Sequence, residues 1–197
     1  MIGADFPAVL MAAKSGEQSA VEVLYRDLHP GVLAFATARV GTEGEDLAAD
    51  VFVTMATALA RFEGDERALR RWVFAIAYRK VGEAWRRARQ RGTHPAPVDE
   101  LGLRAPIGDV EAEALDGLST SEALTAIARL GPPQSEVVLL RVVADLSVEE
   151  VATIVGKRPG AIRALQHRAL IRLAQEFPGS MRNTEALPGH NWVDEPS

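Results

Sequence analysis

The sequence predicts an all-α protein made of two small helical domains joined by an extended linker. Its 197 residues are poor in aromatic side chains, which make up 6% of the chain. Apolar residues recur at helical spacing over long stretches, and the dense alternation typical of half-buried strands is lacking. Proline and glycine gather in residues 92–118, where no helical period is sustained, so this stretch separates the helices into two groups.

Four helices are predicted in the N-terminal group, at roughly 5–14, 19–40, 44–61 and 66–91. In the second, Pro30 removes a backbone donor and is expected to bend or split the helix. The third and fourth show clear apolar stripes. These stripes are interpreted as core, and they comprise Leu47, Val51, Phe52, Met55 and Leu59 in the third helix and Leu69, Trp72, Val73, Ile76, Ala77 and Val81 in the fourth.

The C-terminal group is predicted to have helices near 120–130, 133–144, 147–155 and 159–176. Ser147 can cap the third of these, with Glu150 three residues later as in a capping box. Gly156 supplies a turn in which a residue without Cβ accepts positive φ, and Pro159 suits the first turn of the last helix. The pattern therefore predicts two short helices separated by a tight turn.

The last helix carries its charge on the side opposite to its apolar face, which runs along Ile162, Leu165, Ala169 and Leu173. A short helix braced by another, with cations on its outward side, is suited to enter the major groove of DNA. An ordinary helical hairpin with a solvated face is the alternative. The cationic or polar positions in this segment are Lys157, Arg158, Arg163, His167, Arg168 and Arg172.

Charge is distributed unevenly, although the net formal charge is −5. Cations cluster between residues 79 and 91 and between 157 and 172, while acids collect near 43–50 and 99–116. Screening limits the reach of the distant acids to about 8–10 Å, so local basic faces can still hold phosphates.

Several classes of function are disfavoured. The chain has no cysteine, which excludes disulfides, thiolate metal sites and a cysteine nucleophile. Its four histidines show neither metal-ligand nor nucleophile–base spacing, so we expect no enzyme, no metal and no cofactor. No secretory signal and no membrane-spanning run are recognised, which favours a cytoplasmic protein.

Short motifs along residues 19–176 resemble, in order and spacing, those of one protein family. In the N-terminal half they are Leu-Tyr-Arg-Asp-Leu-His-Pro at 24–30, Glu-Asp-Leu-Ala-Ala-Asp-Val-Phe at 45–52, Arg-Phe-Glu-Gly at 61–64 and Trp-Val-Phe-Ala-Ile-Ala at 72–77. In the C-terminal half they are Leu-Gly-Pro-Pro-Gln at 130–134, Leu-Ser-Val-Glu-Glu-Val-Ala at 146–152, Gly-Ala-Ile-Arg at 160–163 and His-Arg-Ala at 167–169. The sequence resembles a bacterial RNA polymerase sigma factor of the extracytoplasmic-function type.

The resemblance implies an alternative sigma factor, which binds core RNA polymerase, directs it to particular promoters and helps to open the duplex. Promoter DNA and core polymerase would be its partners, together with an anti-sigma factor. Residues 1–91 would form sigma region two and residues 119–177 the helix-turn-helix of region four. Residues 92–118 would be the linker, and residues 178–197 a flexible tail.

By resemblance, the polymerase contact falls on Glu45, Asp46 and Asp50. The family pattern has glutamine and glutamate where this chain has Ala49 and Asp50, so one polar contact is absent and another is shortened. A solvated acidic face favoured by the helix dipole is the alternative interpretation.

Two sets of residues are candidates for contact with promoter DNA. At the −10 element an opened strand needs cations for its phosphates and apolar or aromatic faces for its bases. The candidates there are Phe62, Arg67, Arg70, Arg71, Arg79, Lys80, Arg86 and Arg87, whereas Trp72 is interpreted as core. At the −35 element Arg163, Ala164 and His167 would face the groove, and Lys157, Arg158, Arg168 and Arg172 would meet phosphates.

Two other functions stay open at this point. A sigma-like decoy would bind a regulator without directing transcription, and the altered acidic helix is compatible with it. A one-component helix-turn-helix regulator would have a ligand pocket and a dimer interface in residues 1–91, which the basic stretch 79–91 fits poorly.

Overall fold

The computed structural model describes residues 1–92 and 120–176. The N-terminal half contains α1 (Phe6–Lys14), α2 (Gln18–Val40), α3 (Gly44–Ala58) and α4 (Glu66–Gln90), with single 3₁₀ turns at Gly3–Asp5, Gly41–Glu43 and Leu59–Arg61. The C-terminal half contains α5 (Thr120–Arg129), α6 (Pro132–Val142), α7 (Val148–Val155) and α8 (Pro159–Glu176). Within these residues there is no strand, and the predicted all-α class is confirmed.

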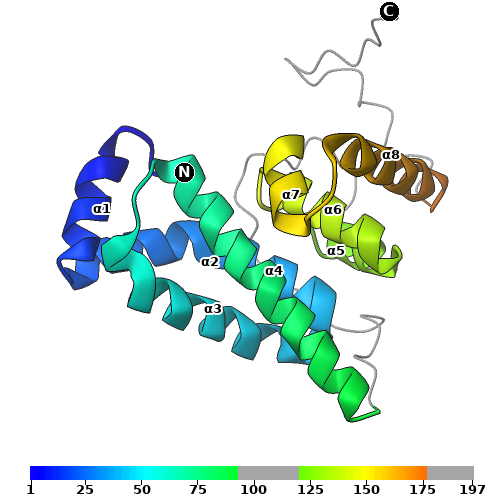
Figure 1. Cartoon of the computed structure of the whole chain (residues 1–197), viewed down its shortest axis with the longest axis horizontal. Coiled ribbons are helices and arrows are strands. Elements are labelled where there is room, and N and C mark those ends of the chain that lie inside the picture. Colours follow the sequence, from blue (N-terminus) through cyan, green and yellow to red (C-terminus); the bar gives the residue numbers. More distant parts are fainter. Residues whose placement is uncertain (93–119, 177–197) are drawn as a thin grey trace, which may run out of the picture.

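The N-terminal half is organised around α2, which packs against α1, α3 and α4 (Figure 1). Its core is filled by side chains from all three long helices, and Phe35 of α2 meets Phe74 of α4 edge-to-face at 6.1 Å between ring centroids. Such ring pairs stabilise a core beyond the area that they bury. The apolar stripes predicted for the third and fourth helices therefore do face the core, apart from the half-buried Trp72.

Pro30 lies inside α2, which continues through it as one α-helix. Of the two expected effects of this proline, a bend or a split, the split is therefore wrong. Leu28 and Val32, on either side of Pro30, are buried, as are Leu24 and Phe35 one turn further out. Packing along the whole face holds the helix together and offsets the single backbone hydrogen bond that the proline removes.

Gly44, at the start of α3, lies at a close approach between α2 and α3. A Cβ at this position would come within 2.4 Å of the Thr37 hydroxyl and 2.6 Å of the Thr37 Cα atom. Only glycine allows that approach, which places the acidic first turn of α3 directly beside the end of α2.

In the C-terminal half, α6 and α7 both pack against α8. Leu139, Leu140, Val151 and Ile162 are fully buried between them. The chain leaves α6 through Asp145, whose φ of 50° lies in the left-handed region that aspartate tolerates better than most residues. This turn points the chain back into α7.

The two halves are in contact: α5 lies against α2, and α7 against α4 (Figure 1). Their buried apolar residues form one continuous cluster. This packing was not foreseen from the sequence. The predicted tail and all of the predicted linker except Gly92 lie outside the described residues, so the domain boundaries stay a prediction.

Candidate nucleic-acid interface

The turn between α7 and α8 is built as the sequence indicates. The Ser147 hydroxyl accepts a hydrogen bond from the Glu150 amide at 3.2 Å, and the Glu150 carboxylate accepts one from the Ser147 amide at 2.7 Å. Gly156 ends α7 with a φ of 70°, in the left-handed region. Free backbone groups at both ends of this short helix thus have hydrogen-bond partners, which fixes the angle at which the chain passes from α7 into α8.

Replacing Ser147 with alanine removes one half of this capping box. We expect the unfolding free energy to fall by about 1 kcal/mol, since an N-cap substitution of this kind typically costs that much. Thermal melts followed by circular dichroism measure it. Ser15→Ala is the matched control, because Ser15 follows α1 directly and its exposed hydroxyl donates to the Ala12 carbonyl within that helix. An equal loss of stability in both variants would contradict the capping role of Ser147.

The exposed face of α8 carries five residues of the predicted −35 set, and Lys157 and Arg158 lie in the turn just before this helix. Ile162, Ala169 and Leu173 are buried against α6 and α7, so the opposite side of the helix faces solvent. Arg163 donates to the Glu149 carboxylate at 3.0 Å in an ion pair whose members are both exposed. All seven predicted residues are exposed: Lys157, Arg158, Arg163, Ala164, His167, Arg168 and Arg172.

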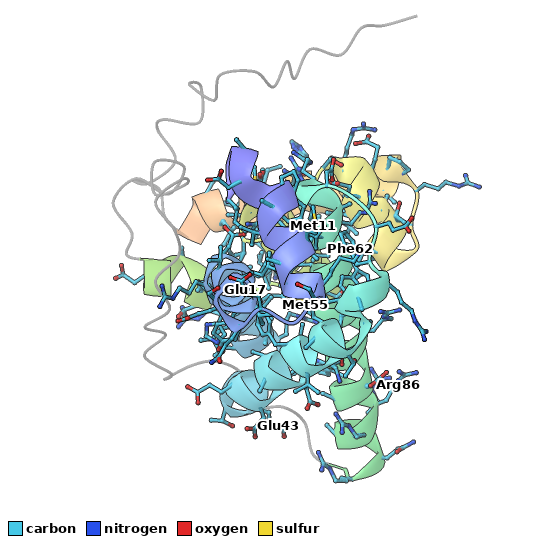
Figure 2. The ribbon with its side chains drawn as sticks, turned by 90° about the vertical axis from the view of Figure 1, so that its left-hand side faces the viewer. Met11, Glu17, Glu43, Met55, Phe62 and Arg86 are labelled. Carbon is cyan, nitrogen blue, oxygen red and sulfur yellow. The ribbon has the colours of Figure 1, made fainter. Side chains whose placement is uncertain are left out.

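The predicted −10 set divides into free and paired cations. Arg79, Arg86 and Arg87 are exposed on α4. Arg86 extends away from the packing of α1–α3 (Figure 2). No ion pair involves these three within the described residues, which leaves them available for phosphates.

The remaining cations of this set have acidic partners. Arg70 is largely buried and pairs with Asp27 of α2 at 2.8 Å, while Lys80 lies 3.6 Å from Asp50 of α3. Arg67 and Arg71 both reach Glu150 of the C-terminal half, at 3.1 and 3.8 Å. The Glu150 hydrogen bond and charge together raise the pKa of Arg67.

Phe62 lies in the short loop between α3 and α4. Its ring stacks on Trp72 at 5.3 Å and 22°, and its carbonyl accepts a hydrogen bond from Lys14 of α1 at 2.8 Å. Figure 2 shows Phe62 at the same end of the molecule as Met11 of α1. Two neighbours shape the loop: Gly64 has a φ of 148°, and the Asp65 carboxylate caps α4 by accepting from the Ala68 amide at 2.7 Å.

The predicted polymerase residues Glu45, Asp46 and Asp50 are all exposed on α3. Near them lies a ring cluster that sequence reasoning did not single out. Tyr25 stacks on His29 at 4.6 Å and contacts Phe52 at 4.7 Å, and Tyr25 is 40% exposed. Burial lowers the pKa of His29, opposed by the nearby charge of Glu45, so this ring is favoured in its neutral form.

A second group missed from the sequence joins the two halves. Arg39 of α2 is 7% exposed and donates to Ser135 at 2.8 Å and to Glu136 at 2.7 Å, both on α6. Its guanidinium also lies over the Trp85 ring, 5.6 Å from the centroid. The available signal was a lone arginine within the apolar run 34–40, which argues for a buried partner.

A crevice of about 460 Å³ lies beside this group, lined by Tyr78, Trp85, Arg86 and Glu136 among others. Burial raises the pKa of Glu136, and the charge of Arg39 offsets part of that rise. Among the described side chains, no group of histidines and acids is placed to hold a metal ion. None of the described helices is long and apolar enough to cross a bilayer.

Family models match both halves of the chain. The model described as sigma-70 region 2 matches residues 24–91, and the one described as sigma-70, region 4 matches residues 115–173.

Curated relatives match over most of their length. The "ECF RNA polymerase sigma factor SigD" of Mycobacterium tuberculosis is 34% identical over 183 residues, which cover 90% of this chain and 86% of that protein. The "ECF RNA polymerase sigma factor ShbA" of Streptomyces griseus is 35% identical over 176 residues, which cover 84% of this chain and 92% of that protein.

Solved structures share the fold. The sigma factor RpoE of Bartonella quintana, solved with the anti-sigma factor NepR, gives a TM-score of 0.60 at 22% identity over 78% of this chain and 94% of that one. CnrH, solved with the cytosolic domain of CnrY, gives a TM-score of 0.58 at 19% identity over 88% of this chain and 97% of that one.

Proposed function

The chain belongs to the extracytoplasmic-function RNA polymerase sigma factors, and we propose that it reads promoters through two separate surfaces, one on α4 and one on α8. Members of this family are transcription initiation factors that direct core RNA polymerase to promoter DNA. We further propose that residues 1–91 and 119–177 act as regions two and four, and that the protein works in the cytoplasm, where the polymerase is.

The helix-turn-helix carries the −35 part of this proposal. The turn after α7 holds α8 against α6 and α7 by its apolar side, and every residue of the predicted set is exposed, either on the other side of α8 or in that turn. Arginine at a groove-facing position can donate two hydrogen bonds to guanine, whereas cations at the edges contact phosphates. Arg163 therefore reads bases, and Lys157, Arg158, Arg168 and Arg172 anchor the backbone.

The −10 part rests on α4 and the loop before it. Arg79, Arg86 and Arg87, which are exposed and have no ion pair within the described residues, can hold phosphates of the opened strand. Phe62, stacked on Trp72, presents an aromatic ring at the start of that helix, where an unstacked base can meet it. Arg70, which is mostly buried against Asp27, contributes by fixing α4 on α2.

Start sites mapped after in vitro transcription with purified core polymerase and this protein test the function directly. Initiation at discrete promoters that core enzyme alone does not use is the expected result. Binding to core without any new start sites would instead identify a decoy.

The variants Arg163→Ala and Lys157→Ala distinguish recognition of bases from binding to the phosphate backbone. We expect Arg163→Ala to reduce discrimination at one −35 position by about 1–3 kcal/mol, because a base contact is lost. Lys157→Ala should weaken binding to specific and random duplexes alike and flatten the salt dependence. Fluorescence anisotropy titrations of duplex at several salt concentrations measure both effects.

Two controls accompany this pair of variants. Gln175→Ala, also exposed on α8 but near its far end, should leave binding unchanged. Glu149→Ala removes the partner of Arg163 and should leave binding the same or tighter. If Arg163→Ala and Lys157→Ala lowered affinity equally on specific and random DNA, the division between the two roles would be wrong.

An anti-sigma factor, expected from the resemblance, stays a proposal. Co-purification of the full chain from cells grown without an inducing stress, followed by identification of the bound protein, tests it. The partner should block the binding of this chain to core polymerase.

A further inference from the structure

We propose that the crevice between α4 and α6 binds a mononucleotide, whose base lies over Gly82 and whose phosphate contacts the arginines at the edge. The crevice has a volume of about 460 Å³, within the range of roughly 300–1,000 Å³ that is typical of small-molecule sites. The binding itself does not depend on the proposed function. Only its effect on promoter DNA rests on that function.

Gly82 keeps the α4 side of the crevice open. It lies inside the helix, where glycine is less favourable than alanine because its more flexible backbone loses more freedom on folding. The packing of the protein does not need a glycine here, since the backbone is helical and a Cβ would meet nothing within 4 Å. The missing side chain therefore makes room only on the exposed side of α4, where Gly82 lines the crevice.

Two aromatic side chains flank this space. Tyr78 lies one turn before Gly82 and Trp85 one turn after it, and both line the crevice and are half-buried. Their separation by seven positions corresponds to a rise of about 10.5 Å along the helix. A flat ring that touches both side chains needs about 7–8 Å, at 3.5–4.0 Å for each contact. One nucleobase fits between them, and bases stack on aromatic side chains of this kind.

Trp85 also has a hydrogen-bond donor without a partner. Its Nε1 atom is buried and makes no hydrogen bond to any described residue. The Arg39 guanidinium lies over one face of the ring, 5.6 Å from the centroid. Because no hydrogen bond holds the indole in place, a small rotation can turn this donor toward an acceptor on a bound base, which then satisfies it.

The edge of the crevice favours an anion. Arg79, Arg86 and Arg89 are exposed there, and none of them forms an ion pair with another described residue. Of the two acids that line the crevice, one is already paired with Arg39, which leaves Glu83 against three arginines. The forked guanidinium matches the geometry of phosphate oxygens, so a phosphorylated ligand is favoured over a neutral one.

The site overlaps the predicted −10 surface. Arg79 and Arg86 belong to the set that is proposed to hold phosphates of the opened strand, and both line the crevice. A bound nucleotide therefore competes with that strand for the same two guanidinium groups. On the proposed function, a nucleotide in the cell would lower the affinity of this protein for promoter DNA.

Isothermal titration calorimetry of the full chain with GMP, AMP, CMP and UMP tests the site. We expect the purine nucleotides to bind at one site with a Kd of about 10 μM, the affinity of a ligand of roughly twenty non-hydrogen atoms at ordinary efficiency. The pyrimidine nucleotides should bind more weakly, because a smaller ring stacks over less area. Guanosine, which lacks the phosphate, should bind about tenfold more weakly than GMP. Inorganic phosphate that bound as tightly as GMP would overturn the contact with the base.

Gly82→Leu fills the space proposed for the base. It should weaken GMP binding by about tenfold or more, while leucine, a better helix former than glycine, keeps α4 intact. Gly160→Leu is the matched control, because Gly160 is also exposed in a helix and a Cβ there meets nothing within 4 Å, yet it lies outside the crevice. Circular dichroism checks that both variants are folded. Unchanged GMP affinity in Gly82→Leu would overturn the site.

Two more substitutions test the phosphate contact and the indole donor. Arg89→Gln should weaken the binding of GMP but not of guanosine, whereas Arg91→Gln, at the C-terminal cap of the same helix and outside the crevice, should change neither. Trp85→Phe keeps an aromatic ring but removes the Nε1 donor, so GMP affinity should fall several-fold. Equal losses for GMP and guanosine in Arg89→Gln would contradict the placing of the phosphate, and unchanged GMP affinity in Trp85→Phe would contradict the role of the donor.

Competition with DNA is measured with a fluorescent single-stranded dT oligonucleotide at low salt. Saturating GMP should lower the affinity of the unchanged protein for this oligonucleotide several-fold, and it should not do so for Gly82→Leu. GMP binding without such competition would overturn the effect on DNA and leave the nucleotide site standing. Binding of the oligonucleotide, with none of the four mononucleotides bound, would overturn the site itself. None of these results bears on whether the protein initiates transcription.

Discussion

Changing Asp46 and Asp50 to lysine together is expected to abolish binding to core RNA polymerase while each half stays folded. Both carboxylates are exposed on α3, whose start is fixed against α2 by Gly44. A carboxylate that meets an arginine at an interface leaves that arginine unpaired when it is removed, which typically costs roughly 2–5 kcal/mol, and reversal adds repulsion. Titration of labelled protein with core enzyme should show a loss of affinity of well over tenfold.

The Asp50–Lys80 contact requires its own control. A lysine at position 50 would face Lys80, so the double variant could also disturb the packing of α3 on α4. Asp46→Lys alone avoids that repulsion and should still weaken polymerase binding more than tenfold. Glu17→Lys with Glu22→Lys changes the net charge equally at the opposite end of α2 and should bind core normally. Normal binding by the Asp46/Asp50 variant would remove this helix as the polymerase contact.

The second large effect is expected at Gly64, in the loop that presents Phe62. Its φ of 148° is rarely adopted by L-residues, and a Cβ would come within 2.7 Å of the Ala68 Cβ and 3.1 Å of the Phe62 ring. Gly64→Val must therefore shift the loop, pull Phe62 off Trp72 and displace the Asp65 cap of α4. We expect a stability loss of about 1–3 kcal/mol and a larger loss of promoter opening.

Gly82→Val is the matched control, because Gly82 lies within α4 and a Cβ there meets nothing within 4 Å. It should change stability by less than 1 kcal/mol, since valine has a somewhat better helix propensity than glycine. Permanganate footprinting of opened promoter DNA, with thermal melts in parallel, measures both effects. If Gly64→Val opened promoters as well as Gly82→Val, the loop would not hold a base.

Sequence reasoning was most successful where one periodic pattern carried the information. The helix bounds follow apolar spacing and caps, and the capping box of Ser147 and Glu150 is confirmed. The split that it allowed at Pro30 does not occur, because local propensity yielded to the packing of Leu24, Leu28 and Val32. The exposed face of α8 could be predicted for the same reason, because the apolar spacing along a single helix shows which of its sides is buried and which faces solvent.

The contacts between the halves could not be predicted. Arg39 meets Ser135 and Glu136 over more than ninety residues of chain, and no spacing rule links positions so far apart. Arg67 and Arg71 look from the sequence like free cations for DNA, yet each has Glu150 within reach. Pairing of this kind depends on tertiary packing, which a single sequence does not reveal.

The ion pair between Lys80 and Asp50 joins a residue expected at DNA to one expected at the polymerase, at 3.6 Å. If DNA binds Lys80, Asp50 is released from the ion pair and becomes available to the polymerase, and the reverse holds if the polymerase binds Asp50. Each binding event therefore favours the other. Thermodynamic linkage requires that DNA binding strengthens polymerase binding by the same factor as polymerase binding strengthens DNA binding. Because the pair is partly exposed, its strength of about 0–1 kcal/mol limits the cooperativity to about fivefold. Lys80→Met should tighten polymerase binding in the absence of DNA by no more than that factor, which a competition titration against the unchanged protein would resolve.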